Sequence, residues 1–187
     1  MISVRIFNKK ADRCLIFLHG LFANEGFWLN YLKYFKNFKV VIANLPYESN
    51  FSPKEYGFEI EQIIKREKIN YAVCHSLGCL IGRFIENRIK CFFICDIFDS
   101  KRINRKKFLN EISSRTNISN HKVNKKLLEV DKNIQALKNE NFVHSKSKSF
   151  FPDKDCYFTY FSPANFRGNH FEINSAMIEI SKELDNV

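Results

Sequence analysis

A serine at position 76 lies in the short motif Cys74-His75-Ser76-Leu77-Gly78, between an apolar run that predicts a strand and a segment with helical spacing. A small-x-Ser-x-Gly turn in this context exposes the serine hydroxyl, which can then act as a nucleophile. Gly78 fits the tight turn, and Cys74 stands where glycine is usual but is still compact. The backbone N–H of Leu77, at the start of the following helix, would point at the same place and could stabilise an oxyanion. The alternative is an ordinary helix N-cap serine.

Two further segments could complete a site for acyl transfer. The segment His19-Gly20-Leu21-Phe22 begins 57 residues before Ser76 and follows the first buried apolar run. It could supply a second backbone donor, the Leu21 N–H, although a plain strand-to-helix turn is the alternative. His170 follows the last predicted strand and precedes the last predicted helix. Because the carboxyl ends of parallel strands share one edge of a sheet, His170 could reach Ser76 as a general base.

The elements that would position these residues alternate along the chain. Continuous apolar runs predict buried strands at 14–18, 40–43, 71–74, 91–95 and 156–161, with 3–7 as a leading edge strand. Helical spacing predicts helices over 26–35, 55–68, 77–89 and 172–184. This alternation indicates an α/β fold with a mostly parallel sheet and helices on both faces. Residues 101–148 show no convincing buried strand. We therefore expect one domain over 1–187 with a helical insertion at about 99–150.

The motifs carry a resemblance to a known family. They are His19-Gly20 followed by Asn24 and Trp28, the turn Asn44-Leu45-Pro46, and His75-Ser76-Leu77-Gly78. With them the sequence resembles the α/β-hydrolase superfamily, and within it the carboxylesterases that demethylate pimeloyl-acyl-carrier-protein methyl ester in biotin synthesis. The resemblance covers residues 14–95 and the terminal strand with His170. It implies Ser76 as nucleophile, His170 as base, the Leu21 and Leu77 amides as oxyanion hole, and Trp28 as a packing or pocket residue. No metal or cofactor is implied.

The sequence departs from the family pattern at the acid of the triad. The family places it after the penultimate strand, but only one clear strand lies between the insertion and His170, and its exit carries no acid. Asp96, immediately after the strand at 91–95, is the best substitute, and Asp99 is the next choice. Asp153 and Asp155 precede the final predicted strand, at its wrong end. We therefore predict a Ser76–His170–Asp96 triad.

Charge is concentrated in the insertion. The whole chain has a net charge of +10, and residues 101–148 hold 13 basic and 4 acidic residues, a net charge of +9. A basic lid over an esterase site predicts docking of an acidic partner, which the resemblance identifies as the acyl carrier protein that bears the substrate. The candidate carrier-binding residues are Arg102, Arg105, Lys106, Lys107 and Arg115. A solvated basic helix face is the alternative.

The composition narrows the class of protein. An apolar content of 45% excludes a disordered chain, and no apolar run approaches the ~20 residues of a membrane span. No apolar stretch typical of a secretory signal is visible, and we interpret the cysteines as buried and reduced, so we expect a cytoplasmic protein. No nucleic-acid motif is present, and only Phe108 and Phe142 are aromatic within 101–148, so we expect no nucleic-acid partner. We also expect a monomer that does not bind membranes. The predicted activity is hydrolysis of a carrier-bound methyl ester. The alternatives are an esterase acting on free short-chain esters and a non-catalytic binding protein with a basic insertion.

Overall fold

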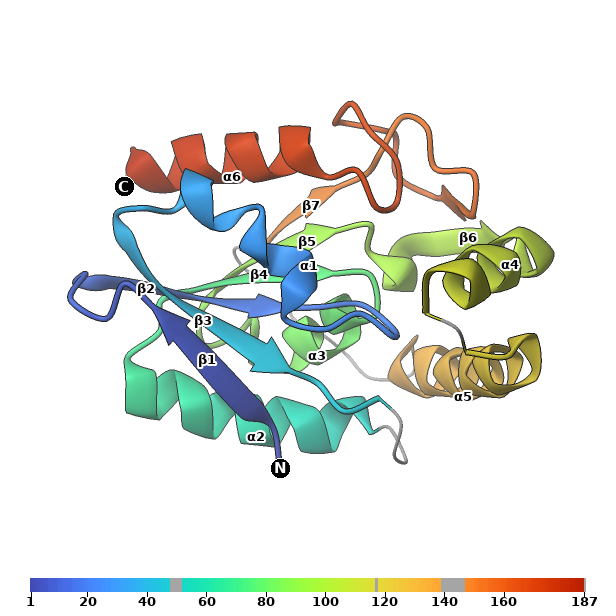
Figure 1. The fold of residues 1–187 in the computed structure, drawn as a ribbon, viewed down its shortest axis with the longest axis horizontal. Coiled ribbons are helices and arrows are strands. Elements are labelled where there is room, and N and C mark those ends of the chain that lie inside the picture. Colours follow the sequence, from blue (N-terminus) through green and yellow to red (C-terminus); the bar gives the residue numbers. More distant parts are fainter. Residues whose placement is uncertain (48–51, 117, 139–146, 187) are drawn as a thin grey trace.

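The protein is described here by a computed structural model, which covers residues 1–47, 52–116, 118–138 and 147–186 (Figure 1). The strands are β1 (Ser3–Phe7), β2 (Arg13–Leu18), β3 (Phe38–Asn44), β4 (Tyr71–His75), β5 (Lys90–Ile94), β6 (Ser100–Ile103), β7 (Lys148–Phe150) and β8 (Phe158–Tyr160). The α-helices are α1 (Gly26–Leu29), α2 (Pro53–Glu67), α3 (Gly78–Ile85), α4 (Arg105–Thr116), α5 (Asn120–Lys138) and α6 (Asn174–Asp185). Two 3-10 helices, η1 (Leu32–Tyr34) and η2 (Ile97–Asp99), complete the described elements.

Six strands form the main sheet, in the order β1-β3-β2-β4-β5-β7. β1 is antiparallel to β3 at one edge, and the other neighbouring strands are parallel. The parallel strands therefore end at one common edge, where α4 and α5 lie (Figure 1). The predicted mostly parallel sheet is confirmed, and so are the strands expected at its centre.

Helices cover both faces of this sheet, because its central strands are apolar on both sides. In β2, Ile16 and Leu18 pack into the core under α2 and α3, whereas Leu15 and Phe17 pack into the core under α1, η1 and α6. Trp28 of α1 belongs to the second core, where its ring stacks on Phe17 with centroids 4.6 Å apart. The packing role expected for Trp28 is thus observed, and it lines neither of the two pockets beside Ser76.

The second half of the chain differs from the sequence prediction in its strands. The main sheet ends with the three-residue strand β7, which pairs in parallel with β5. The aromatic run predicted as the last sheet strand instead contributes β8, which pairs antiparallel with β6 in a separate two-stranded sheet. The expected helical character of the insertion is observed in α4 and α5. Residues 117 and 139–146 of the insertion lie outside the described residues.

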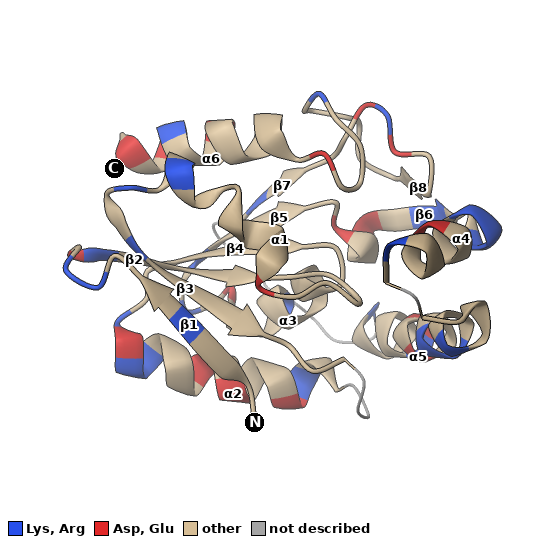
Figure 2. Cartoon of the chain, in the orientation of Figure 1, with Lys and Arg blue, Asp and Glu red and all other residues tan. Residues whose placement is uncertain are grey.

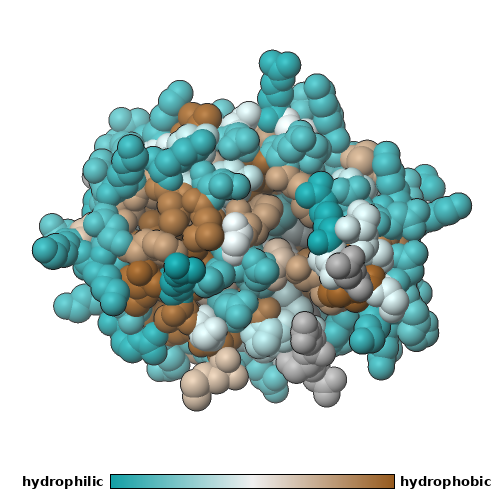
Figure 3. Space-filling model, viewed as in Figure 1, coloured by the Kyte–Doolittle hydropathy of each residue, from teal (hydrophilic) through white to brown (hydrophobic). Residues whose placement is uncertain are grey.

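The face drawn in Figure 3 carries an apolar patch among hydrophilic side chains. Apolar side chains gather over β1 and its neighbours, on the side of the molecule away from α4 and α5 (Figure 3). Lys and Arg residues are frequent on β6, α4 and α5 and also occur on β1 and α2 (Figure 2). No helix in the described ranges is long and apolar enough to cross a membrane.

Candidate active site

Ser76 occupies a strained turn between β4 and α3. Its φ angle is 52°, in the left-handed region that non-glycine residues rarely adopt. The helix that follows begins so close to β2 that a Cβ atom on Gly78 would lie 2.5 Å from the carbonyl oxygen of Leu18. The Ser76 hydroxyl does not cap α3, whose N-cap residue is Leu77 without a side-chain hydrogen bond. The N-cap alternative is therefore wrong, and the turn presents the hydroxyl to other groups.

The Ser76 hydroxyl meets His170. Its Oγ lies 2.9 Å from Nε2 of His170, and both residues are buried, at 4% and 1% exposure. The other ring nitrogen of His170, Nδ1, lies 3.0 Å from Oδ2 of Asp155. The three side chains form a continuous hydrogen-bonded series. Acyl transfer through serine uses such a series, with the three groups as nucleophile, base and acid.

Asp155 is held by four donors. Its Oδ1 accepts from the backbone N–H groups of Tyr157 and Phe158 at 2.8 and 2.9 Å, and its Oδ2 accepts from the Tyr160 hydroxyl at 2.7 Å as well as facing His170. Burial disfavours the charged carboxylate, but the hydrogen bonds and the charge of His170 outweigh burial and hold the pKa of Asp155 below its ordinary value. Asp155 therefore remains a carboxylate at neutral pH.

The prediction that Asp96 orients the base is wrong. Asp96 does follow β5, but its buried carboxylate pairs with Arg83 and accepts the Phe98 N–H at 3.0 Å, so it caps η2. Asp99, the second choice, accepts the Ser162 N–H at 3.0 Å. The reason is the identity of the last sheet strand: β7 ends at residue 150, so Asp155 follows that strand and lies at the carboxyl edge.

Comparison with known proteins agrees with this topology. No protein-family model matches the chain, and no curated protein matches it. Among solved structures, the monoacylglycerol lipase of Paleococcus ferrophilus has a TM-score of 0.70 at 15% identity, covering 100% of this chain and 99% of the other. The esterase EaEST of Exiguobacterium antarcticum has a TM-score of 0.64 at 12% identity, with 99% and 94% covered. The protein has the α/β-hydrolase fold. At these identities the likeness shows the fold alone.

Within the α/β-hydrolase fold, the loop after β2 lies beside the nucleophile. A Cβ atom on Gly20 would lie 3.0 Å from the Ser76 Cβ, so the glycine permits this approach. His19 anchors the loop: its Nε2 accepts the Leu45 N–H at 2.9 Å, and burial lowers its pKa to about 4, which keeps the ring neutral. Leu21 and Leu77 line the same pocket as Ser76. Their backbone N–H groups remain the predicted oxyanion hole.

His75, beside the nucleophile, has a role that the sequence did not indicate. Its Nε2 lies 2.7 Å from the main-chain oxygen of His170, and its ring stacks on Phe27 with centroids 4.8 Å apart. Burial lowers the pKa of His75 to about 3, so the ring is neutral and Nε2 donates the hydrogen bond. His75 therefore ties the turn that carries the nucleophile to the loop that carries the base.

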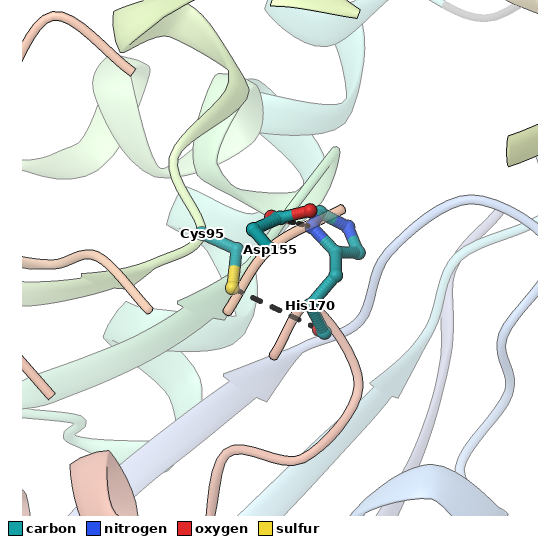
Figure 4. Close-up of side chains that lie close together, drawn as sticks. All are labelled: Cys95, Asp155 and His170. Atoms are coloured by element: carbon teal, nitrogen blue, oxygen red, sulfur yellow. Dashed lines mark hydrogen bonds and ion pairs between the residues drawn. The ribbon is translucent and has the colours of Figure 1, made fainter. Parts of the chain in front are cut away.

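Cys95 contacts the main chain of His170. Its Sγ lies 3.7 Å from the main-chain oxygen of His170 (Figure 4). Cys95, Asp155 and His170 offer ligand atoms within 4.8 Å of one another, a spacing that could suit a metal ion. However, Nδ1 of His170 and the Asp155 carboxylate are already bonded to each other, and burial raises the pKa of the Cys95 thiol well above its ordinary value. The arrangement fits a triad with a thiol packed behind it.

The five candidate carrier-binding residues divide into two groups. Arg105 pairs with Asp131 of α5, and Arg115 pairs with Glu111 while its guanidinium lies 4.6 Å from the Phe171 ring centroid. Arg105 therefore joins α4 to α5, whereas Arg115 pairs within α4 and contacts Phe171. The remaining three are exposed on β6 and α4 and have no ion pair within the described residues: Arg102, Lys106 and Lys107.

Proposed function

We propose that this protein is a serine carboxylic-ester hydrolase. The observation that carries the proposal is the hydrogen-bonded series from Ser76 Oγ through the His170 ring to Asp155. Ser76 attacks the ester carbonyl carbon while His170 Nε2 takes the hydroxyl proton. The Leu21 and Leu77 N–H groups stabilise the oxyanion of the tetrahedral intermediate.

The intermediate then collapses with cleavage of the bond to the alcohol oxygen. His170 returns its proton to that oxygen, and the alcohol leaves. Water, deprotonated by His170, attacks the acyl-serine, and the acid is released as Ser76 regains its proton. Asp155 stays ionised throughout, where it orients the imidazole and stabilises its cation.

Turnover of a chromogenic acetate ester tests this proposal. Ser76→Ala is expected to lower kcat by about a thousand-fold or more. The matched control is Ser181→Ala, because Ser181 is a buried serine of α6 whose hydroxyl bonds within its own helix to Ile178. Retained turnover in Ser76→Ala, with a normal circular dichroism spectrum, would contradict the proposal.

For the substrate we propose the methyl ester of an acyl chain on an acidic carrier protein, in the manner of the pimeloyl esterases of biotin synthesis. What supports it is the basic surface of β6 and α4, where Arg102, Lys106 and Lys107 are exposed. Such charges speed and orient docking to an acidic partner, although single surface pairs contribute only ~0–1 kcal/mol. A cytoplasmic monomer remains our expectation for the state in which it acts.

Charge reversal separates the carrier-bound substrate from free short-chain esters, the second candidate. The double variant Lys106→Glu, Lys107→Glu should lower kcat/KM for the carrier-linked ester about ten-fold, with turnover of a free ester unchanged. The control variant Lys9→Glu, Lys10→Glu changes exposed lysines outside the insertion. Equal effects of the two variants on the carrier-linked ester would favour free esters. Salt-sensitive nucleic-acid binding without hydrolysis would favour a binding protein instead.

A further inference from the structure

Two separate pockets meet at Ser76. The first, here called the α5 pocket, lies between α5 and the η2–β6 segment and is lined by aliphatic side chains, Ile97, Ile103, Leu127, Val130 and Ile134. The second, here called the α1 pocket, lies between α1, α4 and the loop that carries His170, here called the base loop. It is lined by Ala23, Phe27, Ile112 and Phe171. Leu21, Ser76 and Phe108 line both pockets, so the Phe108 ring of α4 forms the partition between them.

The catalytic groups are distributed unequally between these pockets. His170 lines the α1 pocket and not the α5 pocket, whereas Leu77, one of the two predicted oxyanion donors, lines the α5 pocket and not the α1 pocket. In ester cleavage through serine, the histidine that takes the serine proton gives it to the departing alcohol oxygen. The alcohol must therefore leave on the side of the nucleophile that His170 faces.

We infer that the α1 pocket receives the alcohol part of the ester and the α5 pocket receives the acyl chain. This assignment rests on the proposed function and specifies its substrate. Each pocket has a cavity volume of about 30 Å³, so the assignment rests on which catalytic group lines each pocket and not on their sizes.

The linings define the chemical class of each part. The α5 pocket has one charged residue in its lining, Asp131, and that carboxylate is paired with Arg105 at the surface between the lid helices. Its interior therefore favours an apolar acyl chain, with the charged pair at its rim. The α1 pocket is lined by Phe27, Phe171 and Ile112 beside the His75 and His170 rings, a mostly apolar lining that favours a small apolar alcohol. The substrate class is an apolar acyl chain esterified to a small alcohol.

Two matched variants test the assignment. Ile112 of α4 and Leu127 of α5 are both aliphatic lid residues, buried at 3% and 4% exposure, and each lines only one of the two pockets. Ile112→Ala enlarges the α1 pocket, and Leu127→Ala enlarges the α5 pocket. For each variant, kcat/KM is measured as two ratios. The ratio of benzyl acetate to methyl acetate reports on the alcohol part, and the ratio of methyl octanoate to methyl acetate reports on the acyl chain. A ratio measured on one preparation is independent of the folded fraction.

The assignment predicts opposite changes. Ile112→Ala removes three carbon atoms from the α1 pocket. It should raise the benzyl-to-methyl ratio about ten-fold or more and leave the octanoate-to-acetate ratio unchanged, because a single methylene group in an apolar pocket already alters selectivity by about ten-fold. Leu127→Ala should raise the octanoate-to-acetate ratio and leave the alcohol ratio unchanged. The reverse pattern, or both ratios changing in both variants, would overturn the assignment while leaving the esterase intact. A wild-type protein that hydrolyses none of these esters would instead overturn the proposed function, and the assignment with it.

Discussion

The nucleophile and its two partners are held by different kinds of structure. Ser76 lies in a turn fixed by the main sheet: its N–H donates to Ile94 of β5 at 2.9 Å, and Gly78 packs against the end of β2. Asp155 and His170 lie on loops outside regular structure, which are joined by main-chain bonds such as Lys154 N–H to Gly168 oxygen at 3.0 Å. The sheet therefore places the nucleophile, whereas the base and acid are placed by hydrogen bonds between two loops and by aromatic rings around His170, such as Phe158 with ring centroids 4.7 Å apart.

This contrast has a consequence for mutation. A change of the Asp155 carboxylate should lower activity while the fold survives, because it alters hydrogen bonds and removes little apolar packing. A polar change inside the nucleophile region should lower stability, because that region belongs to the buried sheet. The variants below test this division.

The largest expected effect comes from replacing Asp155 by asparagine, and the same replacement of Asp96 serves as its control. Asp155→Asn should lower kcat by about 10⁴-fold, because an amide no longer holds the imidazole in the working tautomer. Asp96→Asn is the matched control, since Asp96 is a buried aspartate paired with Arg83 and does not contact His170. It should lower the free energy of unfolding in urea while kcat of the folded fraction is kept. A larger loss of kcat in Asp96→Asn would restore Asp96 as the acid.

The second effect is a loss of folding stability at acidic pH, caused by the two buried histidines near Ser76, His19 and His75. Burial lowers the pKa of His19 to about 4 and that of His75 to about 3, from an ordinary value near 6.5. Below pH 6.5 these histidines bind protons in the unfolded chain but stay neutral in the folded chain. The free energy of unfolding therefore falls as the pH drops from 6.5 toward the folded pKa values. Between pH 7 and pH 5 we expect it to fall by about 2 kcal/mol for each of the two histidines. Urea melts at the two pH values measure this, and equal stabilities would show that the rings are not buried neutral.

The third prediction concerns the hydrogen bond that links the two regions. His75→Phe keeps the stacking on Phe27 but removes the donor to the His170 main-chain oxygen. We expect kcat to fall about ten-fold, which corresponds to one lost hydrogen bond of ordinary strength. Selectivity for the length of the acyl chain should change little, because His75 lines the α1 pocket and not the α5 pocket. An unchanged kcat would mean that the base loop holds its position without His75.

The smallest effect is expected at Tyr160. Tyr160→Phe removes one of the four donors to Asp155, at 2.7 Å, so the carboxylate becomes more basic and the Asp155–His170 pair binds a proton more readily. The acid limb of the pH profile of kcat/KM should move to higher pH, with about a three-fold loss of kcat at its plateau. A merely structural tyrosine would lower activity equally at every pH.

The parts of the site that could be predicted from sequence are those with local signals. Ser76 stands in a motif whose small residues and flanking strand and helix are visible along the chain, and His170 lies between a strand-like run and the last helix. The buried strands β2, β3, β4 and β5 could be predicted because each is a continuous apolar run.

The acid could not be predicted because its position depends on strand pairing. β7 has three residues and begins with Lys148 and Ser149, so it shows too little apolar pattern to stand out. The run at 158–160 looks like a better sheet strand, but it pairs with β6 instead, and pairing partners are set by contacts distant in sequence. The short apolar segment Phe150-Phe151 before Pro152, followed closely by Asp155, is the signal that could have found the acid.

The most direct test of the triad is covalent labelling with a fluorophosphonate, which reacts with activated serine. Intact-protein mass spectrometry and peptide mapping should find one adduct, located on Ser76, in the wild-type protein. His170→Ala should abolish it, because the hydroxyl then lacks its base at 2.9 Å. Wild-type protein that acquires no adduct, or an adduct on another serine, would contradict the account.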